Sequence, residues 1–394
     1  MMKIFQEEKI YIAGPECFYE GGTEQLQAMK KSAEVCGFGV TLPNDHPLDM
    51  ENPDLQKRAD SIFADLETVM KETTVVIADL EAFRGAEADS GTIYELGMAY
   101  AKKARCYGYT RDKRSLSWKD QSYRLQRSDI LDEHGAPAPY PDLPFAPSVV
   151  ASTKIVEGDF NSCLRYLMTD IEEEVKRRGL EKIGILPVCA DSKMETMQRA
   201  KTQRLRVYLS GPERYALDAR SRYEKYKALG ESLGLEILTP LDGLPELLQS
   251  CTAAAVSKAS EAADPEQGSS ILSALSENPY MRAAVMFKAW QRSIADCDVI
   301  LADLNDYRGY ECSNDVGFEC GAAFQLGKKC FGYMSDTRRM RDRIPNHGDA
   351  EGFRDLNGAN VENFDYPVNL MFASSMTILE GGAESALHRI AEIR

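Results

Sequence analysis

The 394-residue sequence lacks features that would place it in several large classes of protein. No apolar run approaches the roughly 20 residues that a membrane-spanning helix needs, so we expect no membrane partner. Positive charge is in deficit, because 47 Lys and Arg stand against 62 Asp and Glu, a net charge of −15. Without a segregated basic patch such a chain repels a phosphate backbone, and we expect no nucleic-acid partner.

Cysteine and histidine are present but lack the spacings of metal sites and disulfide frameworks. The ten cysteines form no CxxC pair, and several lie in apolar segments such as KCFGY, which is typical of reduced, buried thiols. The four histidines show no i, i+4 spacing, so the sequence predicts no metal site. The opening MMKIFQEEKIYIAG does not have the pattern of a secretory signal. We expect a cytoplasmic protein.

What the sequence does contain is a long internal repeat. IYIAGPECF recurs as VYLSGPERY, and VVIADLEAFRGAEADSGTIYELG recurs as VILADLNDYRGYECSNDVGFECG. The spacing is kept as well, since Asp79 to Glu95 and Asp303 to Glu319 are both 16 residues (95 − 79 and 319 − 303). A period near 200 residues indicates a duplicated domain rather than a solenoid of short repeats.

The repeat divides the chain into copy one, residues 1–180, and copy two, residues 203–394, with an insertion in copy two near residues 245–275. Within copy one, amphipathic segments separate short β-rich runs. The runs expected to form strands are residues 9–14, 39–43, 74–80, 105–110 and 148–153. This alternation predicts an α/β protein with two tandem doubly wound parallel-sheet domains of the flavodoxin or Rossmann type. We expect the two domains to pack as a pseudo-dimer.

Polar and turn residues follow several of the strands expected in copy one. Gly14 and Pro15 follow the first strand, Asp45 follows the second, and the loop with Asp89 leads into a helix. Ligands of doubly wound sheets bind at the carboxyl ends of the strands. We therefore expect these residues on one rim, where they would form a substrate-binding surface.

Glu95 has two interpretations. Thr92-Ile-Tyr-Glu95 fits the capping-box pattern S/T-x-x-E, which would give the glutamate a structural role at a helix start. In copy two the box is broken, because Val316 replaces the threonine, whereas Glu319 is retained. A glutamate in the first turn also feels the helix dipole, which favours the ionised form that a nucleophile needs.

The motifs YIAGP and FRGAEADSGTIYELG resemble those of the nucleoside 2-deoxyribosyltransferase family, and the similarity extends over both copies. In that family a glutamate attacks C1′ of a 2′-deoxynucleoside to form a covalent deoxyribosyl-enzyme, which a purine or pyrimidine base resolves with retention. The resemblance implies that Glu95 is the nucleophile and that a 2′-deoxynucleoside and a free base are the substrates. It implies no cofactor, and it favours a homo-oligomer.

The resemblance also gives roles to residues whose sequence context is ordinary. Asp89 could simply cap a helix, Asp65 lies in a helix that is charged throughout, and Tyr11 alternates with core residues. By resemblance, Asp89 binds the hydroxyl end of the sugar, Asp65 assists protonation of the base, and Tyr11 positions the glutamate. These roles fit the chemistry, because a carboxylate stabilises and captures an oxocarbenium-like centre while a second carboxyl group helps the base to leave.

Copy two departs from the pattern. Ala289 and Ser313 replace the two supporting aspartates, while Tyr208 and Glu319 remain. Ser313-Asn-Asp-Val-Gly-Phe-Glu319 also resembles the related deoxynucleotide N-hydrolases, in which a serine at this position accommodates a 5′-phosphate. Copy two is therefore either a degenerate site or a nucleotide-binding one, and the missing base-side acid favours the degenerate site.

The losses in the two copies are complementary. The family builds each site across a subunit boundary, with the neighbour supplying an Asn-Leu-Met segment. Copy two keeps Asn369-Leu-Met371, whereas copy one has Ala146-Pro-Ser148 at the matching positions. The Asn-Leu-Met segment could otherwise be an ordinary strand edge. We predict one composite, competent site per chain, formed by the two copies together.

Three functions remain compatible with the sequence. The leading hypothesis is deoxyribosyl transfer between bases in nucleoside salvage. The second is N-glycosidic hydrolysis of a nucleoside or nucleotide, which the same covalent intermediate would give if water replaced the acceptor base. The third, non-catalytic nucleotide sensing, is disfavoured in copy one because Glu95, Asp89 and Asp65 are retained together. An aspartate at position 89 favours an uncharged 5′-hydroxyl over a 5′-phosphate.

Overall fold

The computed structural model describes residues 4–43, 45, 48–120, 124–126, 129–131, 138–182, 204–243, 278–348 and 352–393. The insertion expected near residues 245–275 lies outside the described residues. Within the described ranges no helix is both long and apolar enough to cross a bilayer. The eight described cysteines are free thiols, and six of them are buried.

Copy one is built on a five-stranded parallel sheet with the strand order β2-β1-β3-β4-β7. The strands are β1 (Lys9–Ala13), β2 (Gly39–Thr41), β3 (Val75–Asp79), β4 (Arg105–Thr110) and β7 (Lys154–Glu157). The central strand β3 is buried at every position, as expected for a strand covered by helices on both faces. The strand order reverses at β1 and β3, and the carboxyl ends of these two strands are where such sheets bind ligands.

Copy two repeats this sheet with the order β14-β11-β10-β8-β9. Its strands are β8 (Leu205–Ser210), β9 (Leu235–Leu238), β10 (Val299–Asp303), β11 (Lys329–Met334) and β14 (Thr377–Glu380). The prediction of two tandem doubly wound parallel-sheet domains is therefore confirmed.

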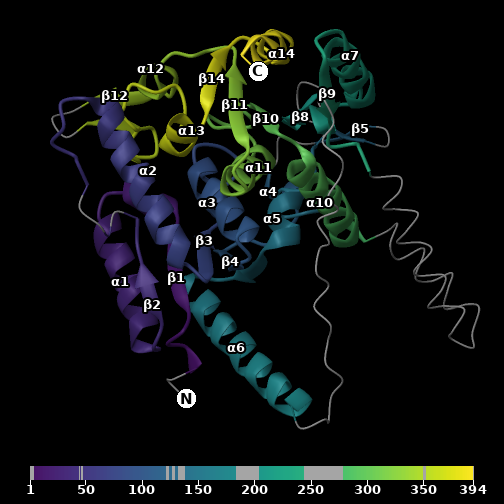
Figure 1. The fold of residues 1–394 in the computed structure, drawn as a ribbon. Helices are drawn as coiled ribbons and strands as arrows, with labels where there is room; N and C mark the ends of the chain where they lie inside the picture. The colour runs from purple at the N-terminus through teal and green to yellow at the C-terminus, as the bar shows by residue number, and fades with distance from the viewer. Residues whose placement is uncertain are drawn as a thin grey trace, which may run out of the picture.

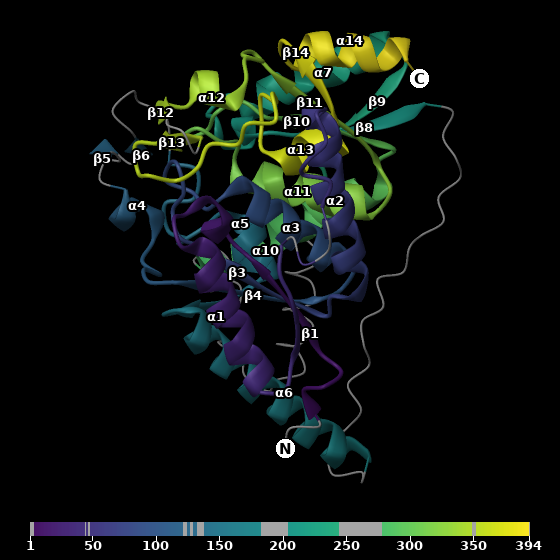
Figure 2. The ribbon, with the colours of Figure 1, turned by 90° about the vertical axis from the view of Figure 1, so that its left-hand side faces the viewer.

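The helices form three layers around the two sheets. The outer layers are α1 (Gly22–Val35) and α6 (Phe160–Lys182) on copy one, and α7 (Ala219–Ser232) and α14 (Ala383–Glu392) on copy two. The inner layer contains α2 (Leu55–Glu72), α3 (Ser90–Ala101), α5 (Pro147–Ser152), α10 (Pro279–Asp296), α11 (Asn314–Gln325) and α13 (Leu370–Ser375). One continuous apolar core joins the inner helices of both copies. Figures 1 and 2 show these helices between the two sheets.

Short elements complete the fold. After β1 and β8 the chain forms the 3-10 turns η2 (Pro15–Phe18) and η3 (Pro212–Tyr215). The remaining short helices are α4 (Leu116–Lys119) and α12 (Met340–Arg343), and the two small antiparallel ladders are β5 (Arg124–Gln126) with β6 (Asp129–Leu131) and β12 (Asn346–Gly348) with β13 (Phe353–Asp355).

Helices α3 and α11 pack against each other at the centre of the molecule, and glycine permits the contact. A Cβ atom on Gly97 would lie 2.1 Å from the backbone oxygen of Phe318, and one on Gly321 would lie 1.9 Å from that of Tyr94. Neither backbone oxygen can move without displacing its helix. The glycine two residues after each repeated glutamate therefore serves the contact between the copies rather than the chemistry.

The strand predicted at residues 148–153 is wrong. This segment is helix α5, and the last strand of the sheet, β7, follows it at Lys154–Glu157. The valine pair suggested a strand by propensity. Pro147 occupies the first helical turn, where its fixed φ and missing N–H are tolerated, and Val149 is fully buried against the inner helices.

Candidate active site

A cavity of about 180 Å³ lies where the two copies meet. Its lining from copy one consists of Gly14, Cys17, Phe18, Pro43, Ile62, Asp89, Gly91, Thr92 and Glu95, and its lining from copy two consists of Glu362, Phe364, Asn369 and Met371. Carboxyl groups and an amide share this lining with apolar and aromatic side chains, the combination expected of a small-molecule site.

Glu95 projects into this cavity from α3. Its Oε1 accepts a 2.6 Å hydrogen bond from the hydroxyl of Tyr11, which is buried on β1. The helix begins at Ser90, and its N-cap is Asp89 rather than Thr92. The capping-box interpretation of Glu95 is therefore wrong, because the glutamate bonds to a tyrosine from another element instead of to its own helix start.

Glu95 also lies one turn deeper in its helix than the sequence suggested, beyond the reach of most of the dipole effect. Burial raises the pKa of Glu95 to about 8, the Tyr11 hydrogen bond opposes that rise, and Asp89 and Glu16 add to it. The carboxyl group is thus poised to titrate near neutral pH, a property that is common among catalytic groups.

Asp89 caps α3 with one oxygen and leaves the other without a partner. Its Oδ2 accepts hydrogen bonds of 2.7 Å from both the backbone N–H and the hydroxyl of Thr92. Its Oδ1 is buried and has no hydrogen-bond partner, and burial raises the pKa of the carboxyl group. A buried oxygen without a partner is unusual in a folded protein, and here it belongs to a residue that lines the cavity.

The cavity and its surroundings hold several other predicted residues. Gly14 lines the cavity, and Pro15 begins the turn η2 beside it. Asp65 is buried on α2, close enough to Tyr11 to raise the pKa of the tyrosine. It lies one turn beyond the lining residue Ile62 on the same side of the helix, but it is not itself part of the lining.

Asp45 is not among the residues that line the cavity. Its Oδ2 accepts hydrogen bonds from the backbone N–H of Leu42, at 2.9 Å, and from the side chain of Lys30, at 2.8 Å. These contacts hold the turn after β2 and join it to α1. The structure therefore gives Asp45 a local turn-forming role.

Asn369 and Met371 reach the cavity from copy two, at the start of α13. Asn369 is the N-cap of that helix and accepts a 3.0 Å hydrogen bond from the backbone N–H of Met371, so the segment is a helix start and not a strand edge. The Asn369 amide lies against Gly91, where an added Cβ would come within 2.8 Å of its nitrogen. The glycine of the AEADSGT loop thus admits the side chain from the other copy.

Sequence reasoning missed Glu362 and Arg84. Glu362 lines the cavity from copy two, and burial raises its pKa to about 8. The buried guanidinium of Arg84 contacts Asp355 and Glu311 at 3.1 and 3.3 Å and donates to the backbone oxygen of Asn360. The repeated Arg-Gly dipeptide was a signal for Arg84, whereas no counterpart or spacing marked Glu362.

The two Arg-Gly dipeptides, one from each copy, pair with each other where the copies meet. Gly85 and Gly309 form an antiparallel bridge, and both preceding arginines have positive φ, 50° at Arg84 and 54° at Arg308. Arg308 contacts Asp120 of copy one at 2.9 Å, as Arg84 contacts copy two. In this way Arg84 anchors the copy-two segment that continues to Glu362 and Asn369.

The equivalent carboxylate in copy two is closed off. Glu319 is fully buried, and Arg214 binds both of its oxygens, at 2.8 and 2.6 Å. Tyr208 and Ser210 donate to the same carboxylate at 2.9 and 2.5 Å. The guanidinium also stacks 4.4 Å from the ring centroid of Trp290. The change from GPEC to GPER was visible in the sequence, but the ion pair it forms was not.

The surface next to this ion pair is filled as well. Tyr215 stands where copy one has Phe18, and its hydroxyl donates to Asp315, which stands where copy one has Gly91. A neighbouring hollow of about 150 Å³ is lined mainly by prolines, aromatic residues and aliphatic residues, and its lining does not include Glu319. Ser313, the other predicted second-site residue, is 1% exposed, and its hydroxyl has no hydrogen-bond partner. The two halves of the pseudo-dimer therefore differ, with one open site and one closed site.

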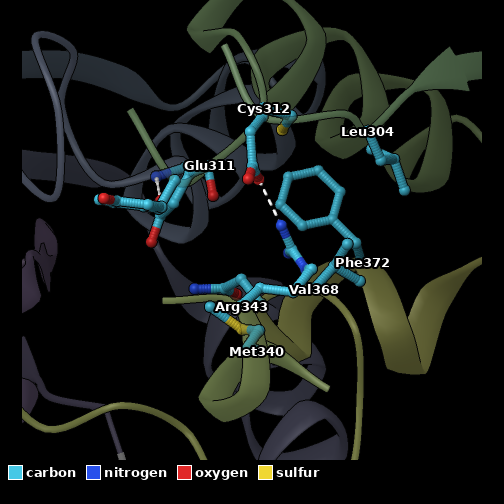
Figure 3. A pocket seen from close by; sticks show the side chains of 11 residues that line it. Leu304, Glu311, Cys312, Met340, Arg343, Val368 and Phe372 are labelled. Carbon is cyan, nitrogen blue, oxygen red and sulfur yellow. Dashed lines mark hydrogen bonds and ion pairs between the residues drawn. The ribbon is translucent and has the colours of Figure 1, made fainter. Parts of the chain in front are cut away.

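A much smaller cavity, whose lining includes Asn369, is drawn in Figure 3. Its volume is about 10 Å³, roughly the space for a single water molecule. Glu311, Arg343 and Phe372 are among the side chains around it. It is too small for a nucleoside.

Comparison with known proteins follows the same division of the chain. The family model for nucleoside 2-deoxyribosyltransferase matches residues 10–147 and again residues 207–371. The chain belongs to this family and contains two copies of its domain. A search of curated proteins gives no match.

Among solved structures, the chain is similar to a 2-desoxiribosyltransferase from Leishmania mexicana, with 24% identity and a TM-score of 0.33, over 48% of this chain and 99% of that one. It is also similar to an ABC sugar transporter subunit from Rhodobacter sphaeroides 2.4.1, with 10% identity and a TM-score of 0.20, over 84% and 78% of the two chains. An ABC transporter solute-binding protein from Agrobacterium vitis with bound allitol gives 9% identity and a TM-score of 0.19, over 84% and 76%.

Proposed function

We propose that this protein transfers 2-deoxyribose between nucleobases at one composite site per chain, with Glu95 as the nucleophile. The observation that carries the proposal is one cavity that is lined by Glu95 and Asp89 from copy one and by Asn369 from copy two. A nucleophilic carboxylate, a hydroxyl acceptor and a trans-supplied amide are the groups that this reaction needs, and family membership supports the assignment.

The reaction has two balanced steps. In the first, an ionised oxygen of Glu95 bonds to C1′ while the C1′–N bond breaks, and the bonding electrons leave with the base nitrogen. The departing base takes up a proton and leaves neutral, and family resemblance assigns the supply of that proton to Asp65, which is buried on α2 one turn from the lining residue Ile62. In the second step a nitrogen of the acceptor base bonds to C1′, Glu95 leaves as a carboxylate, and Asp65 recovers a proton from the acceptor. Two displacements on one carbon give retention.

Tyr11 and the apolar residues have supporting roles in this scheme. The Tyr11 hydroxyl fixes one oxygen of the glutamate at 2.6 Å, so the carboxylate keeps one orientation towards the sugar. Phe18, Phe364 and Met371 give the planar base an apolar surface. Because Arg214 forms an ion pair with Glu319, the role of copy two is to supply a partner surface for the site at Glu95.

The test is product analysis with deoxyinosine, in the presence and absence of free adenine, followed by chromatography. Deoxyadenosine formed with adenine supports transfer, and hypoxanthine released without adenine indicates hydrolysis through the same intermediate. Glu95→Gln should abolish both products. Glu319→Gln, the matched change in copy two, should leave them unchanged in protein that melts cooperatively. An unaltered rate in the Glu95 variant would contradict the proposal.

A further inference from the structure

Copy two retains a hollow where copy one has the Glu95 cavity. The hollow of about 150 Å³ is lined by residues from both copies, as the Glu95 cavity is. Three lining residues of the Glu95 cavity have counterparts in the hollow: Phe18 with Tyr215, Ile62 with Met286, and Phe364 with Pro141. Ile62 and Met286, for example, both lie three residues before the matched Asp65 and Ala289 (65 − 62 and 289 − 286). The hollow is therefore the counterpart of the Glu95 cavity in the pseudo-dimer.

The groups that copy one offers to the sugar are missing from the hollow. The counterparts of its two cavity carboxylates, Glu319 and Ser313, are not part of the lining. The hydroxyl of Tyr215 donates to Oδ2 of Asp315, and the backbone N–H of Ser148 donates to Oδ1 at 3.0 Å. Both oxygens of that carboxylate are thus used inside the protein. The hollow has no nucleophile and no acceptor of the kind that the proposed function assigns to the sugar.

The hollow retains walls suited to a flat heterocycle. The rings of Tyr140 and Tyr215 lie 5.9 Å apart between centroids, at an angle of 71°. Each hydroxyl donates to a buried carboxyl group, Glu87 for Tyr140 and Asp315 for Tyr215, so both rings are held in place. Met286 adds a thioether from α10, and such a group adapts its shape to aromatic partners. Walls of this kind pack against the faces of a nucleobase.

A donor and an acceptor complete the lining. Arg282 from copy two and Asp142 from copy one both line the hollow and approach each other at 3.5 Å, with side chains 44% and 61% exposed. A neutral nucleobase presents donors and acceptors side by side in one plane, so a guanidinium beside a carboxylate matches its edge. A few polar groups on a mostly apolar lining are also the general pattern of small-molecule sites.

We propose that copy two binds a free nucleobase in this hollow without reacting with it. The inference rests on the proposed function, which assigns the matching walls of copy one to the base. It gives copy two a binding role of its own besides that of partner surface. A free base leaves in the first step of the reaction and accepts the sugar in the second. Occupancy of the hollow therefore follows the supply of the acceptor that the Glu95 site uses.

The test separates the two cavities with matched substitutions, Ile62→Trp in the Glu95 cavity and Met286→Trp in the hollow. Binding of radiolabelled adenine is measured by equilibrium dialysis, and transfer is measured as deoxyinosine formed from 2′-deoxyadenosine and hypoxanthine. Met286→Trp should transfer at the parent rate. Ile62→Trp should lose transfer about tenfold or more but still bind one adenine per chain, with a Kd of about 1 mM or lower. The double variant should bind none.

A second variant changes the polar edge and leaves the walls intact. In the Ile62→Trp background, Arg282→Ala should weaken adenine binding about three- to tenfold, as expected for the loss of one hydrogen bond. The matched control is Arg222→Ala, at an exposed copy-two ion pair with Asp218, which should bind adenine as its background does. The Ile62→Trp variant should bind 2′-deoxyadenosine about tenfold more weakly than adenine, because the sugar hydroxyls lose water without the partners that copy one supplies.

The outcomes distinguish this inference from the proposed function. If the parent transfers deoxyribose but Ile62→Trp binds no adenine, or if adding Met286→Trp or Arg282→Ala leaves that binding unchanged, the inference is wrong and the proposed function stands. Equal binding of adenine and 2′-deoxyadenosine would also overturn it, because the hollow would then accept nucleosides. If the parent transfers no deoxyribose, the proposed function fails, and the inference, which takes its ligand from that function, fails with it.

Discussion

Removal of the Tyr11 hydroxyl should move the pH dependence of catalysis. The hydroxyl donates to Glu95 at 2.6 Å in a buried setting, and this hydrogen bond holds the pKa of the glutamate below the value that burial alone would give. Tyr11→Phe removes the hydrogen bond and keeps the ring that packs in the core. The pKa of Glu95 should therefore rise above its present value of about 8.

The size of the effect follows from the strength of the hydrogen bond. A hydrogen bond to a charged group contributes about 1.5–3 kcal/mol, and about 1.4 kcal/mol corresponds to a change of 1 in pKa. The pKa of Glu95 should reach roughly 9 to 10 in the variant. Because only the ionised form attacks, kcat/KM at pH 7 should fall about 10- to 100-fold, while at pH 10 the parent and the variant should nearly converge.

The assay is the initial rate of adenine release from 2′-deoxyadenosine, with hypoxanthine as the acceptor base, between pH 5.5 and pH 10. Tyr208→Phe is the matched control, since Tyr208 makes the same contact to Glu319 in the closed copy, and it should leave the profile in place. A loss of the same factor at every pH, with the acid limb unmoved, would refute the reasoning, because Tyr11 would then act on something other than the ionisation of Glu95.

Three further predictions concern the interface between the copies and the buried carboxyl groups. Asn369→Ser keeps an N-cap on α13 but removes the amide from the cavity, so kcat/KM should fall about tenfold or more while the melting temperature changes little; unchanged kinetics would remove the composite site. Arg84→Met leaves Glu311 and Asp355 without their cation and should lower the free energy of unfolding by about 3–5 kcal/mol in urea titrations at pH 8. The control is Arg338→Met, at an exposed ion pair with Asp336, which should have no measurable effect. Equal stability of the two variants would argue against a structural role for Arg84. Burial raises the pKa of five carboxyl groups in the folded chain, to about 8 at Glu95 and Glu362 and to about 7 at Glu311, Asp79 and Glu213. At pH values above the ordinary pKa of a carboxyl group, the folded chain therefore binds more protons than the unfolded chain. Stability should therefore fall as pH rises from about 5 to about 8.5, seen as a lower melting temperature by calorimetry, and a melting temperature that rose over this range would contradict these ionisation states.

Much of the fold could be predicted because each signal was local. The strands β1, β3 and β4 are continuous apolar runs between polar helices, and the fixed spacing of Asp79 and Glu95 in both copies revealed the duplication. The segment at residues 148–153 failed because its two valines have the same propensity in either setting, and burial against the inner helices determined the outcome. A contact with the other copy leaves no periodic pattern in the local sequence.

The candidate site likewise contains residues that the sequence predicted and residues that it did not. Glu95, Asp89 and Asn369 were recognisable because each stands inside a motif, and all three line one cavity. Asp45 was expected on the rim from its place after a strand, but a side chain can turn back on its own loop, as its hydrogen bond to Leu42 shows. Glu362 gave no signal, because its significance depends on a cavity that two distant segments form.

The asymmetry between the copies also depends on three-dimensional contacts. Replacement of Cys17 by Arg214 at the equivalent position is a single difference in sequence. Its effect follows from geometry, because the guanidinium reaches both oxygens of Glu319 and stacks on Trp290. A buried, fully paired carboxylate is a poor nucleophile, since attack on a sugar would break the ion pair and leave Arg214 uncompensated.

The most direct test of a single Glu95 site is to trap the covalent intermediate. A 2′-fluorinated arabinosyl adenine slows breakdown of a glycosyl-enzyme, because fluorine destabilises the oxocarbenium-like transition state. Intact-mass measurement followed by peptide mapping should find one glycosyl group per chain, on the peptide that contains Glu95, with none in Glu95→Gln. A glycosyl group on the Glu319 peptide, two groups per chain, or steady base release without any adduct would contradict the account.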